Sequence, residues 1–215
     1  MGGRLKVRVV TRWIVPMLAG VCAGICALPQ DTAKETKLKS ASETAAISRF
    51  YIEEPQKDSG YETGPLHIVY GDGTEVVKTL PPLKASTEKD AVFNAVGFSG
   101  VQLAEDRQTL GWTINVENCC TSDSIPLSLV IFRHNDVFRT FDLGQMVWSW
   151  MFVQGGERVA VVTGPTHGPE VGDYRLYDVK TGKVISEIWG DEETQALKPD
   201  APKWAKLLQD HLHSR

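Results

Sequence analysis

The stretch that decides the fold reads Trp150-Met151-Phe152-Val153-Gln154-Gly155-Gly156-Glu157-Arg158-Val159-Ala160-Val161-Val162-Thr163. Its apolar and β-branched residues form two short runs on either side of a Gly-Gly pair, which is the pattern of a β-hairpin. Residues 101–116 show the same pattern around Glu105-Asp106-Arg107, 49 residues earlier. The sequence therefore contains an inner hairpin that occurs twice.

Each inner hairpin is followed by an outer hairpin. Residues 127–141 turn at His134-Asn135-Asp136, and residues 174–189 turn at Lys180-Thr181-Gly182-Lys183, with an offset of 47 residues. A period in the forties built from four short strands has the size of a propeller blade. We therefore predict two four-stranded units.

These units resemble the blades of TolB-like and WD40-like propellers, whose pattern ends in a phrase such as Leu176-Tyr177-Asp178-Val179-Lys180-Thr181-Gly182-Lys183. The chain is also similar to a group of uncharacterised exported bacterial proteins that carry Asn118-Cys119-Cys120-Thr121-Ser122 and Gly164-Pro165-Thr166-His167-Gly168. The resemblance covers residues 66–190. It implies a β-repeat fold and brings no established activity.

One further hairpin is predicted over residues 66–80, around the tight-turn dipeptide Asp72-Gly73. Two units and one hairpin are fewer than the four blades that close a propeller. We therefore expect an all-β, antiparallel fold of ten or so strands, with blade-like four-stranded repeats arranged as a partial propeller or a sandwich. Closure by self-association is the alternative.

The aromatic run at residues 147–153 predicts a central strand of the core. Alternation places Trp148, Trp150 and Phe152 on one face and Val147, Met151 and Val153 on the other, so both faces are apolar. An aromatic platform for a sugar is the alternative interpretation of these rings.

The amino terminus has the pattern of a secretory signal. An apolar run over residues 13–28 follows four basic residues and no acidic one, and it is shorter than the roughly 20 residues of a membrane span. We predict a signal peptide, with a signal helix, over residues 1–27 and an exported protein, periplasmic or secreted. The alternatives are an inner-membrane anchor formed by residues 13–28 and lipidation at Cys22 or Cys26.

Charge argues against two classes of partner. Removal of residues 1–27 leaves 19 Lys and Arg against 27 Asp and Glu, so the net charge changes from -4 to -8. An acidic surface disfavours nucleic acid and anionic membranes as partners. A membrane contact is expected only through an uncleaved amino-terminal segment.

The remaining chain divides by composition. Residues 28–65 predict a flexible tether with one or two helical turns near residues 42–54, residues 66–192 a β-repeat domain, and residues 193–215 a tail. The tail contains a short amphipathic helix that docks its Trp204 face on the sheet, because apolar residues recur there at helical spacing: Trp204, Leu207, Leu208 and His211. A partner-binding helix is the alternative.

Two irregular connections, residues 118–126 and 164–172, occupy equivalent places in the two units. If the units stack in parallel, both emerge on one rim, where binding residues tend to lie. The candidate binding residues in these connections are Cys119, Cys120, Asp123, His167 and Glu170.

The adjacent cysteines are the only ones left after signal removal. Neighbouring Cα atoms lie about 3.8 Å apart, below the usual disulfide range of about 4.4 to 6.8 Å, so a bond between Cys119 and Cys120 would be strained and reducible. The two interpretations left open are a redox-labile pair and two packing side chains. Adjacent cysteines chelate poorly, so no metal site with His167 is predicted.

Standard catalytic motifs are absent from the sequence. Gly97-Phe98-Ser99-Gly100 lacks one residue of a nucleophile elbow and precedes a hairpin instead of a helix. We predict no catalytic residues and no cofactor. The leading hypothesis is an exported, non-enzymatic β-domain that binds a protein, an envelope component or a small ligand through the two connections. The alternative is an envelope enzyme, or a redox-active or metal-binding protein, that uses Cys119, Cys120 and His167.

Overall fold

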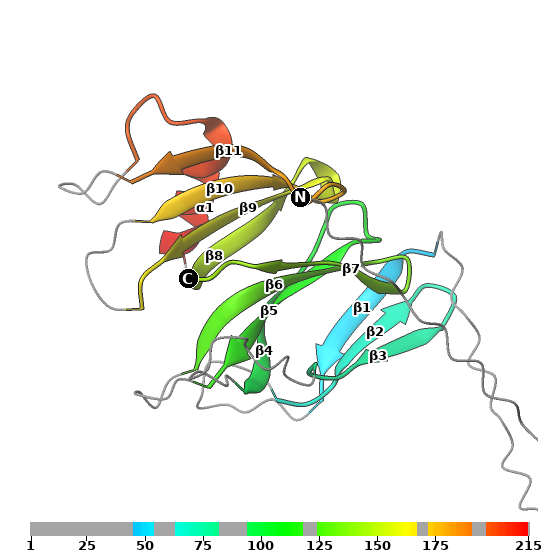
Figure 1. The fold of residues 1–215 in the computed structure, drawn as a ribbon. Helices are drawn as coiled ribbons and strands as arrows, with labels where there is room; N and C mark the ends of the chain where they lie inside the picture. Colours follow the sequence, from blue (N-terminus) through cyan, green and yellow to red (C-terminus); the bar gives the residue numbers. More distant parts are fainter. Residues whose placement is uncertain are drawn as a thin grey trace, which may run out of the picture. The chain divides into compact units, whose positions relative to one another are not determined.

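The computed structural model describes residues 45–53, 63–81, 94–117, 124–166, 172–190 and 197–214. All of them belong to the part of the chain from Leu38 to Arg215. They form three antiparallel sheets and one short carboxy-terminal α-helix, so the described fold is mostly β (Figure 1). The signal helix predicted in residues 1–27 lies outside the described residues and stays a prediction.

Two sheets have four strands each, paired in the order of the sequence. The first sheet contains β4 (Ala95–Leu103), β5 (Leu110–Val116), β6 (Ile125–Arg133) and β7 (Asp136–Asp142). The second contains β8 (Met146–Val153), β9 (Arg158–Gly164), β10 (Asp173–Asp178) and β11 (Val184–Trp189). All these pairs are antiparallel, so the predicted inner and outer hairpins are confirmed in both units.

The third sheet corrects the predicted tether. It contains β1 (Ile47–Ile52), β2 (Leu66–Tyr70) and β3 (Glu75–Lys78), and the hairpin around Asp72-Gly73 is confirmed. The expected helical turns near residues 42–54 are wrong, because β1 pairs with β2 over this stretch. Ile47 is fully buried, and burial of its apolar neighbours overrides the polar composition around them. The folded part therefore begins before residue 66.

The sheets stack in layers because side chains alternate along each strand. In β6, Val130 and Phe132 pack with the three-stranded sheet, whereas Leu129 and Ile131 pack with the second four-stranded sheet. The first four-stranded sheet is thus buried on both faces. This sandwich-like stacking places β8, which belongs to the second four-stranded sheet, directly against β6.

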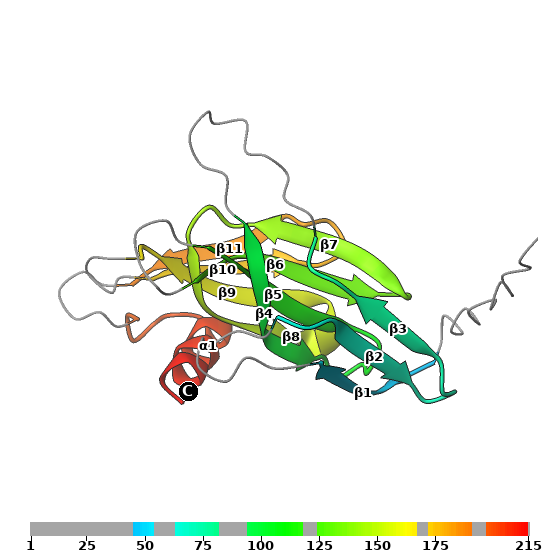
Figure 2. The same cartoon turned by 90° about the horizontal axis from the view of Figure 1, so that it is seen from below.

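The carboxy-terminal helix α1 (Lys203–His213) covers the outer face of the second four-stranded sheet (Figure 2). Ala205 and Leu208 are buried, and Trp204 packs beside them on β9 and β10 residues. The predicted docking of the Trp204 face is confirmed. Leu207 differs from the expectation, because it points outward and is 44% exposed.

The aromatic strand β8 departs from the predicted alternation. A register shift between Val147 and Ser149 moves Trp148 to the face that packs toward α1, whereas Val147 joins Trp150 and Phe152 on the face toward the first sheet. Trp150 is a core residue as predicted, with 1% exposure. The strand is not central, because β8 is the last strand of its sheet in the described fold. Both of its faces are apolar because neighbouring layers cover them.

Connections between antiparallel strands alternate between two ends of the four-stranded sheets. The tight turns form one end, which we call the turn end: residues 104–109, 134–135, 154–157 and 179–183. The strand ends that flank residues 117–124, 143–145 and 165–172 form the other, which we call the loop end.

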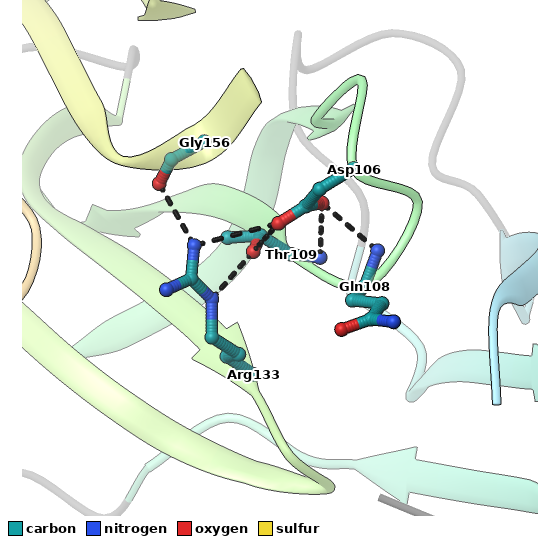
Figure 3. Close-up of polar contacts among 5 residues, drawn as sticks. All are labelled: Asp106, Gln108, Thr109, Arg133 and Gly156. Carbon is teal, nitrogen blue, oxygen red and sulfur yellow. Dashed lines mark hydrogen bonds and ion pairs between the residues drawn. The ribbon is translucent and has the colours of Figure 1, made fainter. Parts of the chain in front are cut away.

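Arg133 joins the two four-stranded sheets at the turn end (Figure 3). Its Nε donates to Thr109 Oγ1 at 2.6 Å, and its Nη2 donates to Gly156 O of the second sheet at 3.0 Å. Asp106 completes the cluster: its Oδ1 accepts from the backbone N–H of Gln108 and Thr109, and its Oδ2 accepts from the Thr109 hydroxyl. The cluster satisfies the buried hydroxyl of Thr109 and fixes how the two units meet.

Candidate binding site

The five residues singled out from the sequence lie outside the residues that the structure describes. These are Cys119, Cys120, Asp123, His167 and Glu170. The structure does describe the strand ends from which their two connections depart. The site can therefore be built from these flanking residues.

One pocket of about 350 Å³ adjoins the carboxy-terminal end of the first connection. Ser124 and Pro126, in the described part of the first connection, line it together with Asn115 of β5. Met146 lines it from β8 and pairs with Gly164, the last residue of β9 before the second connection. The pocket therefore lies at the loop end, beside the first connection and beside the strand partner of Gly164.

The first sheet supplies a chain of hydrogen bonds to this pocket. Ser99 Oγ donates to Asn115 Oδ1 at 2.6 Å and lies 2.7 Å from Thr113 Oγ1. Because the single proton of Ser99 is used on Asn115, the Thr113 hydroxyl donates toward Ser99, whose backbone oxygen is 3.0 Å away. Asn115 Nδ2 donates to Ser124 Oγ at 3.1 Å. The chain therefore runs from β4 across β5 to the described part of the first connection.

This polar chain exists because β5 alternates between two environments. Leu110, Trp112 and Ile114 pack toward the three-stranded sheet. The intervening Thr113 and Asn115 face the opposite way and are 3% and 4% exposed. Buried polar groups require partners, and the network supplies them. The side toward the second sheet is consequently polar at the loop end.

Trp148 connects the pocket to the second connection. Its ring lies so close to Gly164 that a Cβ there would stand 2.1 Å from Trp148 Cζ2. The same ring is the third nearest neighbour of Gly172, at 3.3 Å from a Cβ built there. Gly164 thus relies on the absence of a side chain to accommodate Trp148, which itself lines the pocket, whereas a side chain at Gly172 would first meet Val162 at 2.5 Å.

Among the described residues, none that lines the pocket carries a charged side chain. Its residues are Ser99, Gly100, Thr113, Asn115, Ser124, Pro126, Met146, Val147, Trp148, Ser149 and Trp150. An ion would lose its hydration there without gaining an opposite charge. Hydroxyl, amide and aromatic groups instead suit an uncharged ligand with hydrogen-bonding groups.

A buried carboxylate lies at the base of the second connection. Asp173 begins β10 and is 2% exposed. Its Oδ2 forms an ion pair with Arg175, but its Oδ1 accepts no hydrogen bond from the described residues. Burial raises the pKa of Asp173, although the nearby charge of Arg175 lowers it. Arg175 is shared, because its Nε also donates to Glu187 Oε1 at 2.8 Å.

A second polar cluster, missed in the sequence, crosses the three-stranded sheet. The His67 ring bonds Glu75 through Nδ1 at 2.6 Å and Glu53 through Nε2 at 3.3 Å. Tyr51 stacks on this ring at 4.5 Å and donates its hydroxyl to Glu75. The hydrogen bond with Glu75 is the largest cause that raises the pKa of His67, and the reciprocal bond lowers the pKa of Glu75.

The sequence carried a signal for this cluster. His67 interrupts the apolar strand at an outward position, and the Asp72-Gly73 turn brings Glu75 onto the neighbouring strand. Tyr51 could not be foreseen, because β1 was not predicted. The cluster joins all three strands of the sheet and lies on a strand face away from the pocket.

Metal binding, serine-based catalysis and membrane spanning each place requirements on the described residues. Within them, no group of three His, Cys, Asp or Glu side chains is placed to hold a metal ion. Ser99, the serine of the elbow-like motif, bonds Thr113 and Asn115 and no histidine. The one α-helix among these residues is too short and too polar to cross a membrane.

No protein-family model matches the chain, and a search of curated proteins finds no relative. The geometry of the site is therefore the basis for assigning a function.

Proposed function

We propose that the protein is an exported, non-enzymatic binding module that acts through the loop end. Its ligand contacts come from the pocket and from residues 118–126 and 164–172. The observation that supports this proposal is the loop-end pocket, which adjoins the first connection and is lined by Met146, the strand partner of Gly164. A protein, an envelope component or a small ligand is the partner class, and nucleic acid is disfavoured by the net charge of -8 that follows signal removal.

The scaffold in this proposal is a partial, blade-like repeat that resembles TolB and WD40 blades. Two observations support it. The two four-stranded sheets have the same strand order, and a different element covers the outer face of each. The helix α1 covers the second four-stranded sheet, and the three-stranded sheet covers the first. Each of these two apolar faces therefore has a cover within the described part of the chain.

Loop replacement tests the proposed function. Residues 118–123 and 167–171 are each exchanged for Gly-Ser segments of equal length, and a control chain carries a Ser-Gly exchange of Asp72-Gly73, which keeps glycine at the positive φ of position 73. The three chains and the wild type are incubated with envelope extract, and the bound components are identified and quantified. Loss of one saturable component from both loop variants, with retention by the control and unchanged melting temperatures, supports the proposal. Equal retention by all four chains contradicts it.

Export is tested by amino-terminal sequencing of the protein recovered from the periplasm or the medium. A mature chain that begins within a few residues of Leu28 supports a cleaved signal. A membrane-bound chain that retains Met1 supports the anchor formed by residues 13–28 instead.

A thiol count separates the proposed module from the redox alternative. Two free thiols in the denatured, unreduced mature chain exclude a Cys119–Cys120 disulfide. Replacement of both cysteines by serine is expected to cost no more than about 1 to 2 kcal/mol if they only pack. Complete loss of ligand retention with an unchanged fold would favour a direct role for the thiols.

A further inference from the structure

The pocket lies along the edge of a strand. Five consecutive residues of β8, Met146–Trp150, line it. Trp148 belongs to the face that packs toward α1, whereas Val147 and Trp150 belong to the face toward the first sheet. A pocket that is lined from both faces of a strand runs past the edge of that strand. That edge has no strand partner among the described residues, because β8 is the last strand of its sheet.

A hydrogen bond from the first sheet limits this edge. Gln102 Nε2, from the first sheet, donates to the backbone oxygen of Trp150 at 2.8 Å. The Trp150 carbonyl therefore accepts a hydrogen bond from the first four-stranded sheet. The same bond uses that carbonyl and ends the open part of the edge at Trp150.

The accessible edge is short. Beyond the bond from Gln102, the register shift between Val147 and Ser149 interrupts the regular spacing of backbone groups. Bulges and side-chain caps of this kind keep whole strands of other chains from adding to an edge. A segment of a few residues is all that the edge from Met146 to Ser149 can pair with.

The wall opposite the edge selects the chemistry of such a segment. Ser99, Thr113, Asn115 and Ser124 present hydroxyl and amide groups, and none of the described residues that line the pocket is charged. An extended peptide offers backbone donors and acceptors along one side and alternate side chains toward each face. We infer that the pocket binds a short, extended, uncharged peptide segment that pairs with the free edge of β8.

This inference rests on the proposed function and names its ligand class. Its first test is an affinity selection with the full 215-residue chain. The probe is a library of acetylated, amidated pentapeptides built from Gly, Ser, Thr, Val and Asn. Parallel libraries place one Asp or one Lys at the central position. Enrichment from the neutral library, with little from either charged one, is expected.

N-methylation of the best peptide tests strand pairing directly. Only alternate backbone N–H groups of an added strand face its neighbour. Methylation of one alternate set is therefore expected to weaken binding about tenfold or more, because it removes interstrand hydrogen bonds, whereas methylation of the other set leaves affinity near that of the parent peptide. Amide hydrogen exchange should slow along β8 when the parent peptide is bound.

A pair of half-buried serines provides matched protein variants. Ser124→Lys places a charge in the pocket and is expected to weaken binding of the neutral peptide about tenfold. Ser186→Lys makes the same exchange on β11, at the opposite edge of the second sheet, and should leave affinity unchanged. Melting temperatures of both variants establish that the fold is retained.

The contrary outcomes are distinct. If methylation of either set of N–H groups changes the affinity equally, strand pairing with β8 is overturned. No enrichment from the neutral library, together with saturable binding of a neutral oligosaccharide such as chitotriose that Ser124→Lys weakens, overturns the peptide inference and leaves the proposed binding function standing. Absence of binding to either probe overturns the peptide inference, and the loop-replacement experiment then decides the proposed function separately.

Discussion

The turn end and the loop end of the two four-stranded sheets are built from the same strands and treat polar groups differently. At the turn end, Arg133 and Asp106 give the buried hydroxyl of Thr109 its partners. Arg139 similarly donates to the backbone oxygens of Val179 and Lys180, each at 2.7 Å. At the loop end, Asp173 Oδ1 has no hydrogen bond from the described residues, and a pocket opens beside Asn115.

This difference assigns separate tasks to the two ends. Polar groups at the turn end bind one sheet to the other and are saturated by doing so. Polar groups at the loop end are held in place by Ser, Thr and Asn neighbours and retain capacity for further hydrogen bonds. The turn end therefore joins the two sheets, and the loop end keeps the spare hydrogen-bonding groups that the proposed binding function requires.

The largest predicted effect is at the turn end. Arg133→Ala removes the bonds to Thr109 and Gly156 and leaves a buried hydroxyl and a carboxylate with fewer partners. We expect the free energy of unfolding to fall by about 2 to 3 kcal/mol, measured by urea denaturation. Arg158→Ala, at a strand arginine with no side-chain hydrogen bond to a described residue, should change it by less than about 0.5 kcal/mol. Equal losses would show that the cluster does not join the sheets.

The next effect concerns the loop end. Gly164→Ala forces a methyl group against the Trp148 ring, which has to shift, and should cost about 1 to 3 kcal/mol. Gly71→Ala is the matched control, because its new Cβ would meet only an ordinary contact at 3.7 Å and its φ is not positive. Thermal unfolding measures the stability of both variants, and the tryptophan fluorescence emission should shift only in the Gly164→Ala variant. An unperturbed Gly164→Ala protein would remove Trp148 as the link between pocket and connection.

A substitution at Asp173 tests whether its ion pair with Arg175 stabilises the fold or whether the carboxylate is instead available for binding. Its raised pKa means that the folded state holds the proton more tightly than the unfolded state, so this group's contribution to stability is lost as pH rises through the folded pKa. Asp173→Asn removes the ionisable group and, with it, this loss of stability at higher pH. We expect the melting temperature at pH 7 to be equal or slightly higher, and its pH dependence above pH 4 to flatten. A clear drop at pH 7 would contradict this expectation and make the pair with Arg175 structural.

The smallest effect belongs to the three-stranded sheet. The raised pKa of His67 gives stability below its usual pKa of 6.5 that is lost as pH rises through the folded pKa. The lowered pKa of Glu75 gives stability above its usual pKa of 4.5 that is lost as pH falls through the folded pKa. His67→Gln should therefore lower the melting temperature most between pH 4.5 and 6.5. A difference that is constant from pH 4 to pH 9 would exclude the ion pair as its cause.

Local patterns predicted the strands that pair with their neighbours in the chain. The hairpins over residues 66–80, 127–141 and 174–189 depend on turn residues and nearby apolar runs, and all three are present. The strand β1 was missed because its partner β2 lies beyond an intervening polar stretch and its burial comes from another sheet. The face of Trp148 was missed because a bulge reverses the alternation from which it was inferred.

The five candidate site residues lie outside the described residues, so the site that they form stays a prediction. The sequence indicated two irregular connections in equivalent positions, and the described end of the first adjoins a pocket that Met146, the strand partner of Gly164, also lines. Ser99 and Asn115 were not singled out, because isolated Ser and Asn residues in strands have no pattern that marks a site. Their significance arises from the contact between β4, β5 and the edge of β8.

The sequence by itself determined the four-stranded repeats, because turn chemistry and the alternation of apolar residues act over a few residues of chain. The tertiary structure alone decided which faces are covered, which edge of β8 has no strand partner among the described residues, and where uncharged polar groups gather beside that edge. Those features depend on contacts between layers that are distant in the chain, and no local pattern encodes such contacts.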